Sequence, residues 1–125
     1  NYWYEQIFSD VSQWQQYIDT DWQTVEMKEY LLSFSGVDWI RVNFRVYTQS
    51  NDGARYEIYL NGKEVSSASV GRDDSGWYDK EKFIDVRNYG TGTRVEFKID
   101  NLSYPGTFGI DDIYIHANKR IEEYW

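Results

Sequence analysis

The sequence contains no cysteine, one proline and one histidine among its 125 residues. Without cysteine there can be no disulfide framework and no thiolate metal site, and the redox compartment of the protein stays open. No stretch approaches the roughly 18 apolar residues of a membrane span, and no signal peptide is recognisable. Because no linker, low-complexity segment or internal repeat interrupts the chain, we expect residues 1–125 to form a single domain. Its start at Asn1, without methionine, indicates a processed or excised piece.

Basic residues are scarce relative to acidic ones: 13 Lys and Arg stand against 21 Asp and Glu, which gives a net charge of -8. This charge argues against nucleic acid as a partner, because phosphates require a basic surface. It also disfavours anionic membranes and acidic polysaccharides unless a local basic patch overrides it. The charge therefore leaves neutral ligands and proteins as the expected partners.

Aromatic residues are abundant, at 19% of the chain, with 12 Tyr and 6 Trp. A core of this size cannot absorb them all, so a share of them should lie at the surface, where Tyr and Trp offer an apolar face with a polar edge. Such a surface suits sugars, other proteins or self-association.

Apolar and polar residues alternate over most of the chain, which is the pattern of half-buried β-strands. The dipeptide Asn61-Gly62 predicts a tight hairpin, since a type I′ turn needs a positive φ at both positions. The residues that this alternation assigns to the core are Ile40, Val42, Phe44, Val46, Ile58, Leu60, Val95, Phe97, Ile99, Ile113 and Ile115.

Strands about 8–12 residues apart, with turn signals between them, are typical of a sandwich. We therefore predict an all-β, antiparallel, jelly-roll-like β-sandwich of about eight strands. Residues 24–34 are predicted to form a strand with a bulge near Tyr30, although their helix-forming residues leave a helix as the rival. Residues 9–17 are expected to hold a short helical turn.

Several segments of the second half resemble jelly-roll modules attached to carbohydrate-active enzymes and to extracellular adhesins. These segments are residues 77–86, the turn Tyr89-Gly90, the strand 93–99 and the closing run Gly109-Ile110-Asp111-Asp112-Ile113. The hairpin around Asn61-Gly62 also looks like those of microbial and viral surface proteins. The resemblance covers residues 22–116 and implies a fold, without assigning binding residues one by one.

Catalytic groups are few. His116 is the single histidine and has no nearby serine candidate. The acid pairs Asp73/Asp74 and Asp111/Asp112 are adjacent in sequence, and neighbours in a strand point to opposite faces. Glycoside hydrolysis instead needs two acids about 5–10 Å apart across a cleft. We therefore predict that the protein is not an enzyme.

A structural calcium ion is a possible cofactor, since the modules that this chain resembles often hold one. Calcium takes six to eight oxygen ligands, and Asp111 or Asp112 beside Glu5 or Asp10 would place such a site near the termini. The alternative is that Asp111 caps backbone amides near Gly109 and that Asp112 is solvated.

A binding face is expected on two neighbouring strands. If a hairpin closes around residues 49–53, Tyr47 lies opposite Arg55 and Arg45 lies opposite Glu57. Aromatic rings can then stack on sugar rings while polar groups take hydroxyls; the expected residues are Trp39, Asn43, Arg45, Tyr47, Glu57 and Tyr59. The alternative is a solvated sheet, in which Arg45 and Glu57 form an ion pair worth a few tenths of a kcal/mol.

Two further features accompany this face. Trp77, Tyr78 and Tyr104 form a second candidate platform at one end of the sandwich. The aromatic termini, residues 2–4 and 124–125, are expected to dock on their own domain or on a neighbour, which would allow assembly through terminal strands. Asn101-Leu102-Ser103 is a glycosylation sequon in a loop.

These observations predict a non-catalytic carbohydrate-binding module, extracellular or at the cell surface, for a neutral polysaccharide or glycan. The alternative function is a structural subunit of an extracellular filament, surface layer or virion.

Overall fold

The computed structural model describes residues 2–19, 24–50, 52–100 and 105–120. These residues form nine strands and no helix: β1 (Tyr2–Asp10), β2 (Trp14–Ile18), β3 (Val25–Leu32), β4 (Trp39–Gln49), β5 (Ala54–Leu60), β6 (Lys63–Val70), β7 (Gly76–Asp85), β8 (Thr93–Asp100) and β9 (Gly106–Arg120). The all-β prediction is confirmed, and residues 25–32 are a strand rather than a helix. The helical turn predicted within residues 9–17 is wrong, because β1 ends at Asp10, β2 begins at Trp14, and residues 11–13 between them form no helix.

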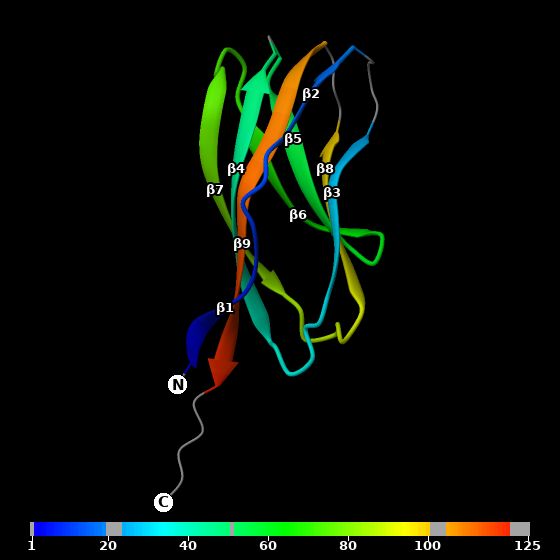
Figure 1. The fold of residues 1–125 in the computed structure, drawn as a ribbon, viewed down its shortest axis with the longest axis vertical. Helices are drawn as coiled ribbons and strands as arrows, with labels where there is room; N and C mark the ends of the chain where they lie inside the picture. Colours follow the sequence, from blue (N-terminus) through cyan, green and yellow to red (C-terminus); the bar gives the residue numbers. More distant parts are fainter. Residues whose placement is uncertain (1, 20–23, 51, 101–104, 121–125) are drawn as a thin grey trace, which may run out of the picture.

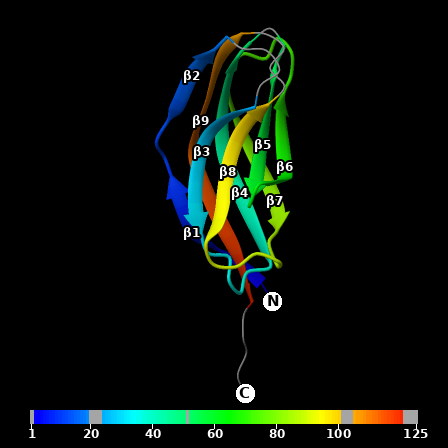
Figure 2. The ribbon, with the colours of Figure 1, turned by 90° about the vertical axis from the view of Figure 1, so that its right-hand side faces the viewer.

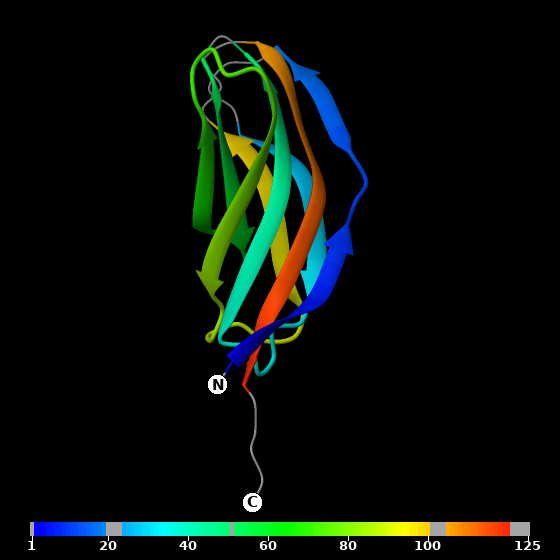
Figure 3. The same ribbon diagram turned by 90° about the vertical axis from the view of Figure 1, so that its left-hand side faces the viewer.

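The strands form two antiparallel sheets that pack face to face as a jelly roll (Figures 1–3). One sheet has the order β1-β9-β4-β7, with β2 pairing β9 beyond the end of β1; we call it the five-stranded sheet, and Figure 3 shows its outer side. The other has the order β3-β8-β5-β6, and we call it the four-stranded sheet (Figure 2). In the described segments, no helix has the length and apolarity that crossing a membrane would need.

Strands β4 and β5 lie in different sheets, so the hairpin predicted around residues 49–53 is wrong. Strand β4 pairs with β7 and β9, whereas β5 pairs with β6 and β8. The loop between them turns a corner at Gly53, whose φ is +72° and whose Cβ, if it had one, would lie 2.3 Å from the Val70 carbonyl oxygen. The Tyr56 hydroxyl crosses the core and donates to the Tyr47 carbonyl oxygen, which joins the two sheets at this corner.

The core lies between the two sheets and contains every residue that the alternation assigned to it. Phe44 of the five-stranded sheet meets Phe97 of the four-stranded sheet, with ring centroids 5.7 Å apart and an edge-to-face angle of 65°. Buried residues that the alternation did not select include Phe34 and Val37, which lie in the loop before β4, and Phe108 and Ile110 of β9.

One open side of the sandwich, between β1 and β3, is closed by side chains. The rings of Phe8 and Tyr30 lie 4.5 Å apart. Asp10 accepts hydrogen bonds from the Ser12 amide and hydroxyl, the Tyr30 hydroxyl and Lys28 Nζ. Partial burial opposes the charge of Asp10, but these hydrogen bonds outweigh it and hold the pKa of Asp10 well below its ordinary value.

Strand β9 contains a bulge next to its two aspartates. Asn43 pairs with Tyr114 and Arg45 with Asp111, so two residues of β9 oppose Phe44 of β4. Asp112 accommodates the extra residue with a φ of +50°, a conformation that aspartate tolerates better than most residues. The bulge therefore breaks the strict alternation that would send Asp111 and Asp112 to opposite faces.

Candidate functional site

Tyr47 and Trp77 form an aromatic pair on the outer side of the five-stranded sheet. They are direct cross-strand partners on β4 and β7, with ring centroids 5.2 Å apart at an angle of 50°. The Arg45 guanidinium carbon lies 4.6 Å from the centre of the Trp77 ring. We call Arg45, Tyr47 and Trp77 the platform. Its two rings are half-buried, so each keeps part of its surface in contact with solvent.

Arg45 is fixed in place by Asp111. Its Nε and Nη2 atoms donate to the two carboxylate oxygens of Asp111 at 2.9 and 2.8 Å, while Asp112 lies 3.8 Å from Nε. Asp111 is buried, and its hydrogen bonds raise the pKa of Arg45 further above its ordinary value. A bidentate pair of this kind holds the guanidinium plane in one orientation, so the platform is a preformed arrangement of two rings and a cation.

Gly109 makes room for the platform. It lies opposite Tyr47 on β9, and a Cβ there would lie 3.2 Å from the Tyr47 Cβ and 3.4 Å from the Trp77 Cη2. The same Cβ would lie 2.9 Å from the Trp14 carbonyl oxygen. Glycine in a strand often marks such a close approach, and here it lets the two rings lie low over the sheet.

A polar cavity of about 360 Å³ adjoins the platform. Asn43 Nδ2 donates to Glu81 Oε2 at 3.1 Å on the same outer face. The residues that line the cavity are Asn43, Phe44, Arg45, Asp79, Lys80, Asp112 and Tyr114. Its size lies within the range of small-molecule sites, and its lining offers amide, carboxylate, ammonium and phenol groups next to two aromatic rings.

The face predicted from the sequence is only partly assembled. Trp39, Asn43, Arg45 and Tyr47 all belong to β4, but Glu57 and Tyr59 belong to β5 in the other sheet. Glu57 is buried and accepts a hydrogen bond from the Tyr59 hydroxyl, and Lys98 Nζ lies 4.4 Å from the centre of the Tyr59 ring. The prediction that these six residues share one face is therefore wrong, because β4 and β5 do not pair.

The second predicted platform is also divided. Trp77 joins Tyr47 on the outer face, whereas Tyr78 points the other way, packs against the core and donates to the Ser75 carbonyl oxygen. Tyr104 lies outside the described residues, as do Asn101, Tyr124 and Trp125. Sequence reasoning thus named both rings of the platform but placed them in two separate sites.

The four carboxylates proposed for calcium do not converge in the structure. Asp111 and Asp112 both face Arg45, whereas Asp10 is bound by Lys28 and Tyr30 between β1 and β3. Glu5 lies on β1 opposite Ala117. Calcium binding and its predicted ligands stay a prediction, although the structure pairs Asp111 with Arg45 and Asp10 with Lys28.

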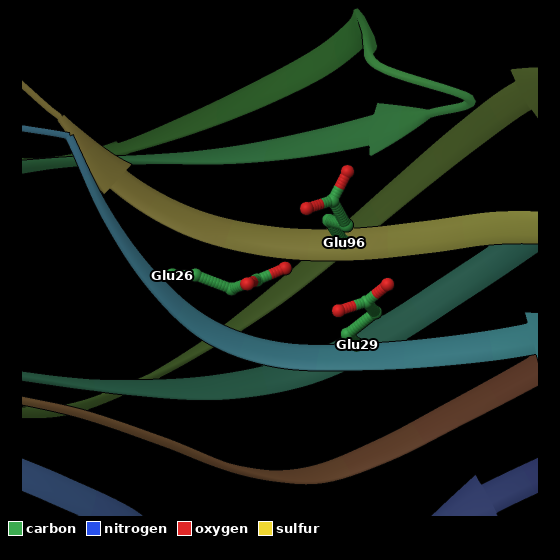
Figure 4. Close-up of side chains that lie close together, drawn as sticks. All are labelled: Glu26, Glu29 and Glu96. Atoms are coloured by element: carbon green, nitrogen blue, oxygen red, sulfur yellow. The ribbon is translucent and has the colours of Figure 1, made fainter.

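A different acidic cluster lies on the outer side of the four-stranded sheet, where Glu26, Glu29 and Glu96 point toward one another (Figure 4). Their nearest carboxylate oxygens lie within 4.8 Å of one another, a spacing that could hold a cation. Glu96 is also paired with Arg94 and Lys98. Glu26 donates to Glu96, which raises the pKa of Glu26 to about 7 and lowers the pKa of Glu96.

These carboxylates should make the stability depend on pH. Burial and a hydrogen bond with Glu64 likewise raise the pKa of Glu57 to about 7, from an ordinary value of 4.5. Between about pH 4.5 and 7, Glu26 and Glu57 therefore bind more protons in the folded protein than in the unfolded chain, so their contribution to the free energy of unfolding falls as the pH rises through this window. We expect Glu26→Gln to raise the melting temperature at pH 8 and to change it little at pH 4.5.

Thermal unfolding followed by circular dichroism at the two pH values measures this effect. Glu5→Gln is the matched control, because it removes the same charge from an exposed position on the other sheet. A Glu26→Gln variant that is no more stable than the Glu5→Gln variant at pH 8 would refute the assignment.

A groove of about 580 Å³ lies near the facing edge strands β6 and β7. The residues that line it are Lys63, Glu64, Val65, Ile84, Asp85, Asn88 and Tyr89. It combines one aromatic ring with polar groups, but Asp85 is held by Arg87 and Glu64 by Arg55. The groove is a further place on the described surface where a small ligand could bind.

No protein-family model and no curated protein matches the chain. The chain does match several solved structures. The C-terminal CBM6 of LamC, a marine laminarinase from Zobellia galactanivorans, is 16% identical, with a TM-score of 0.53 over 92% of this chain and 98% of that one. A family 35 carbohydrate-binding module from Clostridium thermocellum is 11% identical, with a TM-score of 0.52 over 92% of this chain and 97% of that one.

A chain in the structure of infectious bursal disease virus, Gx strain, is 10% identical in sequence to this chain, with a TM-score of 0.54 over 99% of this chain. This chain spans only 33% of that viral chain. At such low identities the likeness is one of fold. The resemblance to jelly-roll modules that the sequence indicated is confirmed at that level.

Proposed function

We propose that this protein is a non-catalytic carbohydrate-binding module that recognises neutral polysaccharide on the outer face of the five-stranded sheet. The observation that carries the proposal is the platform: two half-buried aromatic rings beside an arginine whose plane is fixed by Asp111. An aromatic ring packs against the apolar C–H face of a sugar ring. A fixed guanidinium and the nearby amide and carboxylate groups can exchange hydrogen bonds with hydroxyls.

The chemistry of the neighbouring acids supports binding rather than catalysis. Both oxygens of Asp111 accept hydrogen bonds from Arg45, so this buried acid serves to hold the guanidinium of the platform in place. The likeness to carbohydrate-binding modules, which is one of fold, agrees with this function and with an extracellular or cell-surface location. The net charge of -8 favours a neutral ligand.

Affinity gel electrophoresis tests the proposal directly. Native gels containing hydroxyethyl cellulose, xylan, galactomannan or laminarin should retard the protein in at least one case, relative to a gel without polysaccharide. Migration that none of the four polysaccharides changes would contradict carbohydrate binding.

A structural subunit of a filament, surface layer or virion is the rival function, and the fold likeness to a viral structure favours it. Strand β1 pairs with β9 of the same chain from Tyr2 to Asp10. If β1 paired with another copy of the chain instead, it would have to give up its pairing with β9 of its own chain. Light scattering that increases with protein concentration, without any retardation by polysaccharide, would favour this rival.

A further inference from the structure

A second aromatic patch lies on the outer face of the five-stranded sheet, toward the opposite end of β4 and β7 from the platform. Phe83 of β7 and Tyr4 of β1 meet edge to face with centroids 6.1 Å apart, and the Arg41 guanidinium carbon lies 5.2 Å from the centre of the Tyr4 ring. Phe83 is 52% exposed and Tyr4 38%. We call Tyr4, Arg41 and Phe83 the lower patch. Residues so far apart in sequence form one surface because β1, β9, β4 and β7 are neighbours (Figure 3).

The cation of the lower patch differs from Arg45 on the same face and from Arg87 in the loop after β7. Arg45 and Arg87 are each paired with a carboxylate, whereas Arg41 has no such partner among the described residues. Its cross-strand neighbour on β9 is His116. The Arg41 Nε and the His116 Nδ1 are also the two buried side-chain nitrogens that lack a hydrogen-bond partner in the described part of the chain. Buried polar atoms are usually hydrogen-bonded, so two that are not, on residues directly opposite each other on β4 and β9, call for an explanation.

The chemistry of these two nitrogens fits a hydroxyl group. Arginine can only donate, whereas a neutral histidine can accept at one ring nitrogen. Burial and then the charge of Arg41 lower the pKa of His116, which keeps the ring neutral at pH 7. A hydroxyl both donates and accepts, so it is a group that can satisfy both nitrogens. Glu81 and Asp85, the acids two residues before and after Phe83 on β7, are already bound by Asn43 and Arg87.

The spacing of the two aromatic patches indicates the size of the ligand. Trp77 and Phe83 are six residues apart on β7, which corresponds to roughly 20 Å along an extended strand. The polar stretch between them contains the hydrogen bond from Asn43 to Glu81 and part of the 360 Å³ cavity. A single sugar ring cannot reach both patches, but an extended chain of sugars can lie along the face and contact each in turn.

We propose that the lower patch is a second sugar subsite, so that the ligand class is an extended polysaccharide bound along its length rather than a terminal sugar. This inference rests on the proposed function of the platform and adds the second contact. The occupant is a sugar chain because the patch continues the platform on the same face and because the exposed rings of Tyr4 and Phe83 can pack against the apolar face of a sugar ring.

Calorimetric titration tests the inference with the oligosaccharides of whichever polysaccharide retards the protein most. The probes are cellohexaose, xylohexaose, mannohexaose or laminarihexaose, each compared with the matching disaccharide. We expect the wild-type protein to bind the hexasaccharide at least tenfold more tightly than the disaccharide. Phe83→Ala should weaken hexasaccharide binding about tenfold, a typical cost for a contact residue, and leave disaccharide binding unchanged.

Leu31→Ala is the matched control, because Leu31 is an apolar residue that is 72% exposed on the other sheet. It should alter neither affinity. Equal affinities for the two lengths, or an unchanged hexasaccharide affinity in Phe83→Ala, would overturn the second subsite while leaving the platform intact. Loss of concentration-dependent association in Phe83→Ala, without a change in sugar affinity, would instead assign the lower patch to contact between copies of the chain. Failure of all four polysaccharides to bind would overturn both proposals.

Discussion

Trp77→Ala is expected to weaken polysaccharide binding at least thirtyfold. Removing a central aromatic from a binding patch costs on the order of 2 kcal/mol or more, which corresponds to this factor in affinity. The loss should be large because Trp77 contributes in two ways: it offers its own ring, and it packs against both Tyr47 and the Arg45 guanidinium. Calorimetric titration with the polysaccharide that binds best gives the affinity.

Tyr59→Ala is the matched control for this variant. Tyr59 is an aromatic of similar burial, but it lies on the other sheet beneath Lys98. We expect it to bind as tightly as the wild-type protein. A loss of affinity in Tyr59→Ala, with none in Trp77→Ala, would move the site to the four-stranded sheet.

The largest effect on stability is expected for Phe97→Ala, at about 3–5 kcal/mol of unfolding free energy. Phe97 is 1% exposed and makes edge-to-face contacts with Phe44 and Tyr30, at 5.7 and 6.3 Å between ring centroids. The substitution would therefore leave a cavity between the two sheets and remove aromatic contacts worth more than their area. Domains of this kind are stable by only about 5–15 kcal/mol, so the loss is a substantial part of the total.

Urea unfolding measures this difference as a shift of the transition midpoint. Phe83→Ala makes the same chemical change at a half-exposed position and should stay within about 0.5 kcal/mol of the wild-type protein. Similar losses for the two variants would contradict the assignment of Phe97 to the core and Phe83 to the surface.

The alternation of residues in the sequence was sufficient to predict the core and the fold class. Each strand shows which side is apolar, so Ile40, Val42 and Ile58 were placed correctly. Alternation does not show which sheet a strand joins, because strands from both sheets turn apolar sides toward the same core. A hairpin at residues 49–53 and a loop that crosses from one sheet to the other therefore look alike in sequence. Because the hairpin was chosen, Glu57 and Tyr59 were predicted on the wrong face.

Pairing between strands that are far apart along the chain could not be predicted from the sequence either. Tyr47 and Trp77 are neighbours because β4 pairs with β7, and no local pattern encodes that contact. One signal could have been used: Gly109 interrupts a strand of large residues, and glycine in a strand often marks a close approach of another group. The bulge at Asp112 overturned the assumption that adjacent aspartates point apart, and so concealed the partner of Arg45.

An amide chemical-shift titration with the polysaccharide that retards the protein most tests the location of the site directly. We predict that the largest changes occur at the Trp77 indole and at the backbone amides of Arg45, Tyr47 and Gly109, all on the outer face of the five-stranded sheet. Changes concentrated at Tyr59 and Lys98 on the opposite sheet, or at Lys63 and Tyr89 in the groove beside β6, with the Trp77 indole unmoved, would contradict the assignment.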